Sequence, residues 1–199
     1  VAARAVGLIL GLECTLNPFL TNPVYGEIAD LPHANKVALL REPEFRDRLL
    51  AEAGERARAK LGGNLIARFD LLFEMQDEPD YEPTLDDSVA AHAARAGISP
   101  EEYALDVMVR NGGRNDGKGL LYLPFLNYVD GNLDGVHEML AHPHTVPGLG
   151  DGGAHVGTIC DASFPTTLLA YWGRDRKRAT LPLPYLVQQH CRDTARTVG

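Results

Sequence analysis

The sequence predicts an α/β protein in which short strands alternate with helices. Three observations support this fold class. The continuous apolar run Val6–Leu12 suits a strand that is buried on both faces, as in a parallel sheet. Helix start signals such as Ser99-Pro100-Glu101-Glu102 recur along the chain, and a further apolar run, Leu120–Tyr128, follows them. Strands that alternate with helices are typical of the α/β class.

The composition is that of an ordinary globular domain. The chain has 199 residues, of which 45% are hydrophobic and 23% are charged, so one domain with its own core is expected. Its formal net charge is -8. Nucleic acids and anionic membranes bind basic surfaces, so we expect neither as a partner. No apolar run reaches the roughly 18 residues that a membrane-spanning helix needs.

The three cysteines do not form a recognisable motif. Cys14, Cys160 and Cys191 are far apart, and no Cys-x-x-Cys pair is present, so neither a zinc ribbon nor a disulfide framework is indicated. Thiols without such a pattern are typical of a reducing compartment, and the sequence therefore predicts a cytoplasmic protein.

Helices are predicted to dominate the first half of the chain. Pro43–Leu61 repeats apolar residues at four-residue steps and ends at Gly62-Gly63. Leu65–Phe73 is apolar enough for a strand. Thr84–Ala96 is predicted to be a helix in which Thr84 and Asp87 form the capping pair, and Ser99 should cap the next helix.

In the second half, strands and helices are predicted to lead into and away from a glycine-rich stretch. Asn132 is expected to cap a helix that closes before Pro143. A short strand over Thr145–Pro147 should then deliver Asp151. Further helices are predicted over Ser163–Gly173 and from about Pro184 to the end of the sequence.

Asp151 is the strongest candidate for chemistry. It lies in the run Gly148-Leu149-Gly150-Asp151-Gly152-Gly153-Ala154-His155-Val156, after the predicted strand. A carboxylate at the carboxyl end of a strand can act as a general base or a metal ligand. Two alternatives remain open: an Asp that satisfies N–H groups within a glycine-rich turn, and a loop that cradles a phosphate.

The histidines give a weaker signal. His155 could share a metal with Asp151 or be oriented by it. His142-Pro143-His144 has the His-x-His pattern of a metal site, but His144 precedes Asp151 by seven residues. An extended segment of that length spans about 20 Å, so His144 and Asp151 should lie at opposite ends of the strand. No Gly-x-Ser-x-Gly run is present, so a serine nucleophile is not supported.

With these segments the chain resembles the N-acyl-D-amino-acid deacylases (D-aminoacylases) of the amidohydrolase superfamily. The specific part is the run His142–Arg176, HPHTVPGLGDGGAHVGTICDASFPTTLLAYWGRDR. Asn17-Pro18-Phe19, Tyr81-Glu82-Pro83, Asn127-Tyr128 and the closing QQHCRDTARTVG also match. The similarity covers most of the chain in order.

The resemblance implies a metal-dependent hydrolase with a TIM-like (β/α)₈ barrel and one or two zinc ions. Asp151 matches the aspartate that closes the last barrel strand, which serves as general base and can touch the metal. Zinc-bound water would then attack the amide carbon of an N-acyl amino acid. Substrate contacts are expected from His155, Asn127, Tyr128 and Arg174, the last as a partner for a substrate carboxylate.

The chain also departs from the family pattern. The His-x-His of the first barrel strand is absent, and the mid-barrel zinc ligands are expected before residue 1. A barrel takes about 250 residues. We therefore expect residues 1–199 to be the carboxyl-side portion of a catalytic barrel, a fragment with a large helical insertion at about 30–115. Most zinc ligands should lie outside this chain, which is expected to be inactive alone and unable to assemble a full zinc site.

Two other functions remain open on the sequence alone. The chain could belong to a cyclic-amide hydrolase of the same superfamily, similar to hydantoinases or dihydroorotases. It could instead be a non-catalytic α/β module that binds a small acid or a protein partner. The sequence predicts neither the preferred substrate side chain nor the oligomeric state.

Overall fold

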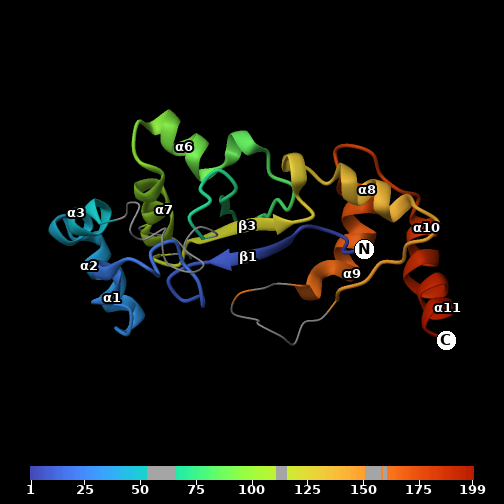
Figure 1. Ribbon diagram of the computed structural model, residues 1–199, viewed down its shortest axis with the longest axis horizontal. Helices are drawn as coiled ribbons and strands as arrows, with labels where there is room; N and C mark the ends of the chain where they lie inside the picture. The colour runs from blue at the N-terminus through green and yellow to red at the C-terminus, as the bar shows by residue number, and fades with distance from the viewer. Residues whose placement is uncertain (53–65, 111–115, 151–157, 159–160) are drawn as a thin grey trace. The chain divides into compact units, whose positions relative to one another are not determined.

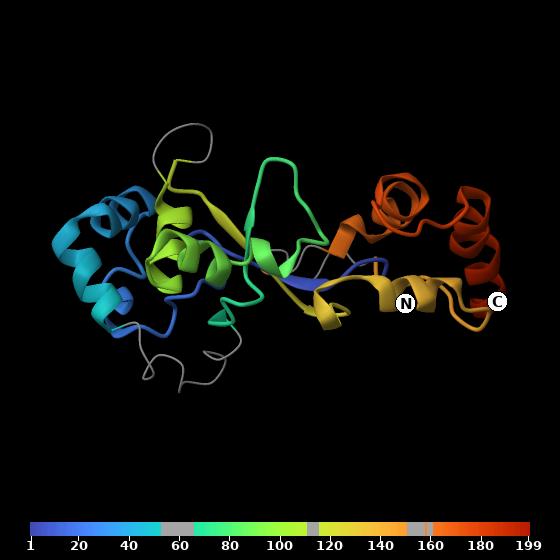
Figure 2. The same ribbon diagram turned by 90° about the horizontal axis from the view of Figure 1, so that it is seen from above.

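The computed structural model describes residues 1–52, 66–110, 116–150, 158 and 161–199. It is a mixed structure of helices and one small sheet (Figures 1 and 2). The chain divides into two compact units, one of Leu8–Leu123 and one of Val1–Gly7 with Pro124–Gly199. Among the described residues, none of the helices has the length and apolar character that crossing a membrane requires.

The sheet has three described strands in the order β1-β3-β2. They are β1 (Val6–Leu10), β2 (Phe73–Met75) and β3 (Leu120–Leu126). β2 pairs with β3 in antiparallel register, Phe73 opposite Tyr122, and the arrows of β1 and β3 point in opposite directions (Figure 1). The two predicted apolar strands are therefore confirmed, but the expectation of a parallel sheet is wrong for these strands.

The predicted strand over Leu65–Phe73 is also wrong in its described part. The amide of Leu71 donates to the carbonyl of Arg68 at 2.8 Å, which closes a turn, and Arg68 also forms an ion pair with Asp70 at 2.7 Å. The strand starts only at Phe73. Apolar content alone misplaced the strand, because Ile66, Phe69 and Leu72 are buried although none of them lies in a strand.

The Leu8–Leu123 unit is mainly helical. Its α-helices are α1 (Pro23–Gly26), α2 (His33–Arg41), α3 (Pro43–Ala51), α6 (Val89–Ala96) and α7 (Pro100–Val109). Side chains join the α2–α3 pair to α7: Arg41 Nε donates to the carbonyl of Val109 at 2.9 Å, and Arg46 pairs with Asp106 at 2.6 Å. Residues 53–61 of the helix predicted at Pro43–Leu61 lie outside the described residues.

Local capping chemistry explains where α6 and α7 begin. Ser99 Oγ accepts from the amide of Glu102 at 3.1 Å, as predicted for the start of α7. The prediction that Thr84 caps the helix before α7 is wrong. Thr84 donates to the carboxylate of Asp87 at 2.7 Å beside the 3-10 turn η1 (Leu85–Asp87), and the extended Ser88 then caps α6.

The other unit gathers α8 (Asp134–Ala141), α9 (Phe164–Ala170), α10 (Leu183–Gln188) and α11 (Thr194–Val198) around the N-terminal segment. Short 3-10 turns lie at Val129–Gly131 and Asp161–Ser163. The predicted helices that follow Asn132, cover Ser163–Gly173 and begin near Pro184 are confirmed. The predicted Asn132 cap is wrong, because Leu133 holds the cap position of α8 and Asn132 Oδ1 accepts from the amide of Asp134 at 2.9 Å just before the helix. π-helical turns at Tyr171–Asp175 and Gln189–Asp193 extend α9 and link α10 to α11.

The fully buried Trp172 is central to the core of this unit. Its indole Nε1 donates to the carbonyl of Ala3, and the guanidinium of Arg176 lies 4.8 Å from its ring centroid. The hydroxyl of Tyr185 in α10 donates to the carbonyl of Leu140 in α8 at 2.8 Å. These bonds connect the N-terminal segment, α8, α9 and α10.

The α6 cap gives a direct test of the fold. Ser88→Ala should destabilise the protein by about 1 kcal/mol, because the first turn of α6 loses its side-chain acceptor. Thr84→Ala is the matched control and should cost less than about 0.5 kcal/mol, since its hydrogen bond is exposed. Urea unfolding followed by circular dichroism measures both changes. A larger loss for Thr84→Ala than for Ser88→Ala would contradict this assignment.

Candidate functional site

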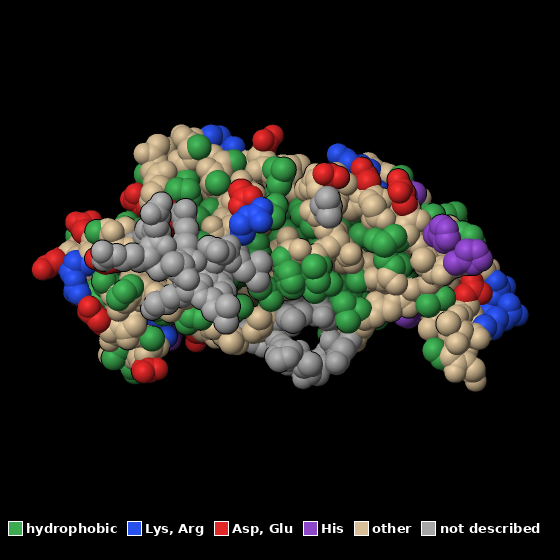
Figure 3. All heavy atoms as spheres, in the orientation of Figure 1, with side chains coloured by type: hydrophobic (Ala, Val, Ile, Leu, Met, Phe, Trp, Pro, Cys, Tyr) green, Lys and Arg blue, Asp and Glu red, His purple; other side chains and the backbone are tan. Residues whose placement is uncertain are grey.

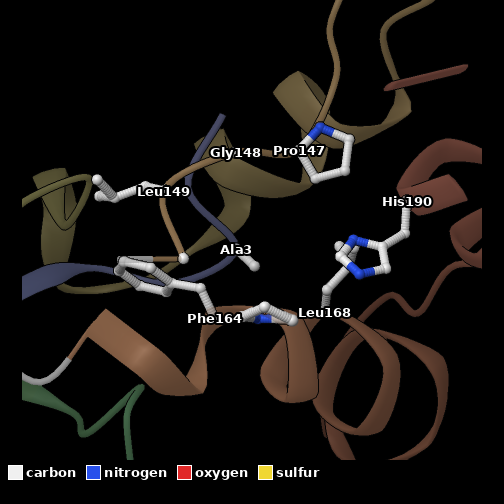
Figure 4. A pocket seen from close by; sticks show the side chains of 9 residues that line it. Ala3, Pro147, Gly148, Leu149, Phe164, Leu168 and His190 are labelled. Carbon is white, nitrogen blue, oxygen red and sulfur yellow. The ribbon is translucent and has the colours of Figure 1, made fainter. Parts of the chain in front are cut away.

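The candidate site is a small pocket in the unit that contains α8–α11. Its lining residues come from four separate parts of that unit: Ala3, Pro147, Gly148, Leu149, Gly150, Phe164, Pro165, Leu168 and His190. Figure 4 shows Pro147 and Gly148 on one side, Phe164 and Leu168 on the other, and the imidazole of His190 reaching in from a separate helix. The pocket volume is about 110 Å³.

Backbone bonds to the N-terminal residue hold the first wall in place. The nitrogen of Val1 donates to the carbonyl of Val146 at 2.7 Å, and the amide of Gly148 donates to the carbonyl of Val1 at 2.9 Å. The strand predicted at Thr145–Pro147 is nevertheless absent from the described chain. Pro143 and Pro147 have no N–H to donate, which prevents regular pairing of this segment.

Leu149 has an unusual backbone conformation. Its φ is +65°, in the left-handed region that costs an L-residue roughly 1–2 kcal/mol. Such outliers in bulky residues persist where the surrounding structure enforces them, and they gather at functional sites. Leu149 lines the pocket and precedes Asp151 by two residues. The strain therefore marks the same stretch that the sequence singles out.

The opposite wall is apolar and firmly packed. Phe164 and Leu168 are one turn apart on α9, and both are almost fully buried. Pro165 comes within 3.3 Å of the position that a Cβ on Gly150 would take, so a side chain at residue 150 would crowd α9. Ala3 completes this side, and its carbonyl is held by Trp172. The pocket is thus built on helix packing rather than on loops alone.

Among the residues that line the pocket, His190 carries the polar side chain. It is half-buried and lies in the π-helical turn Gln189–Asp193. Its imidazole makes no hydrogen bond or ion pair with the described part of the chain. π-helical turns are rare and often occur at functional sites, because the extra residue changes the direction of the side chains.

Arg4 is a buried cation next to this pocket. Its side chain is covered by the protein, its Nε donates to Ser163 Oγ at 3.2 Å, and its Nη1 donates to the carbonyl of Ala5 at 3.0 Å. The guanidinium also lies 4.5 Å from the centroid of the Phe164 ring. Arg4 therefore fixes the start of α9 and orients the aromatic wall.

The residues predicted from the sequence are only partly placed. Asp151 and His155 lie outside the described residues, as does Cys160. Asn127 follows β3 with a φ of +60°, and the neighbouring Tyr128 is buried. Neither is among the described lining residues of the pocket.

Arg174 is not brought to the pocket either. Its side chain is 78% exposed and pairs with Asp175, to which its Nη2 donates at 2.9 Å. This bond lowers the pKa of the Asp175 carboxyl and raises that of the guanidinium. The structure thus gives Arg174 a local partner, and its contact with a substrate carboxylate stays a prediction.

A metal site cannot be built from the described residues. In the described ranges, no three His, Cys, Asp or Glu side chains are grouped so that they could hold an ion. His142 and His144 lie with ring centroids 5.5 Å apart, but His142 Nδ1 accepts from the amide of His144 at 3.2 Å. Of the cysteines, Cys14 is half-buried, and burial, followed by the charge of Glu13, raises its pKa; Cys191 is exposed.

On the face shown in Figure 3, the charged side chains of the described residues do not form a large patch of one sign. Lys and Arg side chains are scattered among Asp and Glu, and histidines gather over the unit that contains α8–α11. Elsewhere in the chain, exposed charges form ion pairs, such as Arg48–Glu27 at 2.6 Å and Arg110–Glu74 at 2.5 Å.

Comparison of the chain with protein-family models, with curated proteins and with solved structures gave no match.

One residue that lines the pocket, His190, and one residue next to it, Arg4, were not predicted from the sequence. His190 looked like one of several scattered histidines, and nothing in the local sequence indicates the π-helical turn that directs it. Arg4 carried a usable signal, because an arginine inside the apolar run Val1–Leu10 must find several acceptors if that run is buried.

The ion pair between α8 and Arg176 makes the stability of this unit depend on pH. Arg176 is buried and bonds Asp134, which lowers the pKa of that carboxyl; Arg178 adds to the effect. A lowered folded-state pKa adds stability above the unfolded pKa of about 3.9, and this stability is lost as the pH falls through the folded value.

Asp134→Asn should therefore lower the thermal midpoint at pH 7, and the difference from the parent should shrink below about pH 4. Glu138→Gln, an exposed change on the same helix, is the control and should leave the midpoint unchanged at both pH values. Thermal melts across this pH range measure the effect. An equal difference at pH 7 and pH 3 would rule out the ion pair as its source.

Proposed function

We propose that this chain is the carboxyl-side portion of a metal-dependent amidohydrolase that deacylates N-acyl-D-amino acids. The substrate is a small molecule, and neither a nucleic acid nor a membrane is a partner. The proposal includes a TIM-like barrel completed by residues outside this chain and a cytoplasmic location. Its main support from the sequence is the run Asp-Gly-Gly-Ala-His at Asp151–His155, followed by Cys-Asp-Ala-Ser-Phe-Pro-Thr at Cys160–Thr166.

One structural observation supports the proposal most strongly. The pocket wall Pro147–Gly150 ends in the residue that precedes Asp151, and Leu149 within it has a strained backbone. A small apolar pocket whose lining ends one residue before a candidate base in the sequence suits a substrate with a compact apolar group, because binding sites are mostly apolar with a few placed polar groups.

Asp151 is the proposed general base. Amide hydrolysis adds water to the carbonyl carbon and breaks the carbon–nitrogen bond. Asp151 would accept a proton from the attacking water and pass it to the leaving amine nitrogen. The products are a carboxylic acid and a free amino acid.

The described residues of this chain hold no group of three metal ligands for the zinc that the resemblance implies. In the proposed whole enzyme, most of its ligands come from outside these 199 residues, with Asp151 as a contributing ligand. Zinc would polarise the substrate carbonyl in that enzyme. For this chain, the proposal is limited to the base and the substrate pocket.

The test uses a longer protein that carries this chain together with its flanking sequence on both sides. Asp151→Asn should lower kcat for hydrolysis of an N-acetyl-D-amino acid by about 10²–10⁴-fold, because an amide cannot accept the proton. Asp47→Asn, an exposed change on α3, is the control and should keep parental activity. Metal content and circular dichroism establish that both variants are folded.

Two results would contradict the proposal. If the longer protein binds no zinc and hydrolyses no N-acyl amino acid, the amidohydrolase assignment gives way to a module that binds small acids. If Asp151→Asn is as active as the parent, Asp151 is not the base. Hydrolysis of a hydantoin or dihydroorotate in place of the linear amide would instead favour the cyclic-amide hydrolase.

A further inference from the structure

We propose that an exposed face of the helices α10 and α11 binds the acidic segment 77–87 of a second copy of this chain. The face consists of an apolar stripe with a row of arginines beside it. This inference concerns self-association, so it goes beyond the proposed function and does not rest on it.

The apolar stripe follows α10, the π-helical turn Gln189–Asp193 and α11, which form one helical run (Figure 1). Its members are apolar, exposed and spaced by three or four residues: Leu183, Val187, Cys191, Ala195 and Val198. The exposed fractions of its three largest side chains are 52%, 44% and 81% for Leu183, Val187 and Val198. Leu186 and Gln189 of the same run are buried, so the stripe is a second face that the core does not use.

The π-helical turn helps to keep the stripe on one face. In an α-helix, residues four apart are about 400° apart around the axis, so a stripe with this spacing drifts by about 40° at each step. A π-helical turn takes more residues, which offsets the drift where the stripe crosses Gln189–Asp193. Contiguous exposed apolar side chains with a polar rim are typical of a protein interaction surface.

Arg192 and Arg196 form a positive row beside the stripe. Each directly follows a stripe residue, Cys191 or Ala195, and therefore lies about 100° further around the helix axis. Both are exposed, and Arg192 pairs with the neighbouring Asp193 at 2.9 Å. Residues 174–199 hold six Lys or Arg and two Asp, although the whole chain has a net charge of -8. An acidic partner therefore complements this part of the chain.

The acidic segment 77–87 has the matching chemistry. It contains six Asp or Glu residues and no Lys or Arg. Glu78, Asp80 and Asp86 are exposed, and Leu85, which precedes Asp86 on the 3-10 turn η1, is 46% exposed. An exposed leucine among carboxylates complements an apolar stripe that is flanked by arginines.

Charge also determines how two copies pair. If the stripe packed against itself in antiparallel fashion, the arginine row of one copy would lie beside the same row of the other, and like charges oppose this arrangement. Pairing of the stripe with the acidic segment brings opposite charges together instead. Such a head-to-tail contact joins copies into rings or open chains, because each copy keeps one unused surface of each kind.

The first measurement is analytical ultracentrifugation of the 199-residue protein from about 10 to 500 µM. The weight-average mass should rise with concentration, and the rise should shrink between about 50 and 500 mM NaCl because salt screens the charge pairs. Val187→Asp should weaken association about tenfold or more, since it places a carboxylate in the stripe against an acidic partner. Met139→Asp, a change at an exposed apolar residue of α8 outside the stripe, is the matched control and should associate like the parent.

Charge reversal identifies the two surfaces. Arg192→Glu with Arg196→Glu should abolish association, and so should Glu78→Lys with Asp86→Lys in a separate protein. An equimolar mixture of these two variants should associate again, because each then complements the other. Lys118→Glu with Lys177→Glu changes two exposed lysines outside both surfaces and should leave association intact. Circular dichroism establishes that every variant is folded.

Several outcomes would overturn the proposal. One is the mass of a single chain at every concentration, and another is a mixture of the two charge-reversed variants that stays monomeric. A disulfide between two copies under mild oxidation that Cys191→Ser abolishes would show that the stripe pairs with itself. If the protein stays monomeric but binds vesicles of phosphatidylserine and phosphatidylcholine through Arg192 and Arg196, the stripe is a membrane-binding surface instead.

Discussion

The hydrogen bond from Trp172 to the carbonyl of Ala3 is the interaction on which the unit with the pocket depends. It ties the N-terminal segment to the end of α9, at a fully buried indole. The guanidinium of Arg176 covers that indole and reaches Asp134 at the start of α8. A buried indole N–H without an acceptor would cost about 1–3 kcal/mol, so this bond strongly disfavours other positions of the N-terminal segment. Once Ala3 is fixed, Val1 is positioned to bond Val146 and Gly148, and one wall of the pocket is set.

The π-helical turns connect this packing to the pocket. The turn at Tyr171–Asp175 extends α9 at Trp172, and the turn at Gln189–Asp193 carries His190. An α-helix continued regularly through residue 190 would present its side chains about every 100°, whereas the wider turn shifts the residues after it around the axis. Within its turn, the hydroxyl of Thr194 donates to the carbonyl of Gln189 at 2.9 Å. The Thr194 hydroxyl thus satisfies a backbone carbonyl within the π-helical turn. The imidazole of His190 makes no hydrogen bond within the described chain.

Features set by neighbouring residues were predictable from the sequence, and features set by distant residues were not. Ser99 caps α7 as predicted, because capping needs only the next three residues. The predicted cap at Thr84 is wrong because α6 begins later, after Ser88, which is extended and forms a bridge with the distant Phe73 of β2. The antiparallel sheet was missed for a similar reason: an apolar run indicates burial of a strand, but the direction of its neighbour depends on the path of the whole chain. The strand expected at Thr145–Pro147 is absent because Pro147, and Pro143 just before the segment, have no N–H to donate to a neighbouring strand.

The same distinction applies to the candidate site. Its candidate base belongs to a local sequence pattern, whereas its pocket depends on residues that are distant in the sequence. The glycine-rich run around Asp151 can be recognised directly in the sequence. The pocket, in contrast, is lined by residue 3, residues 147–150, α9 and residue 190. Such a cavity recognises the part of a ligand that does not react, while a general base acts on the part that does. Binding energy from a non-reacting group can position the reacting bond only if both are held by one rigid frame. Trp172, Arg4 and α9 supply such a frame up to Gly150, the residue before Asp151. In the proposed function, substrate recognition and catalysis are therefore separable, and recognition can be measured on this chain without the metal.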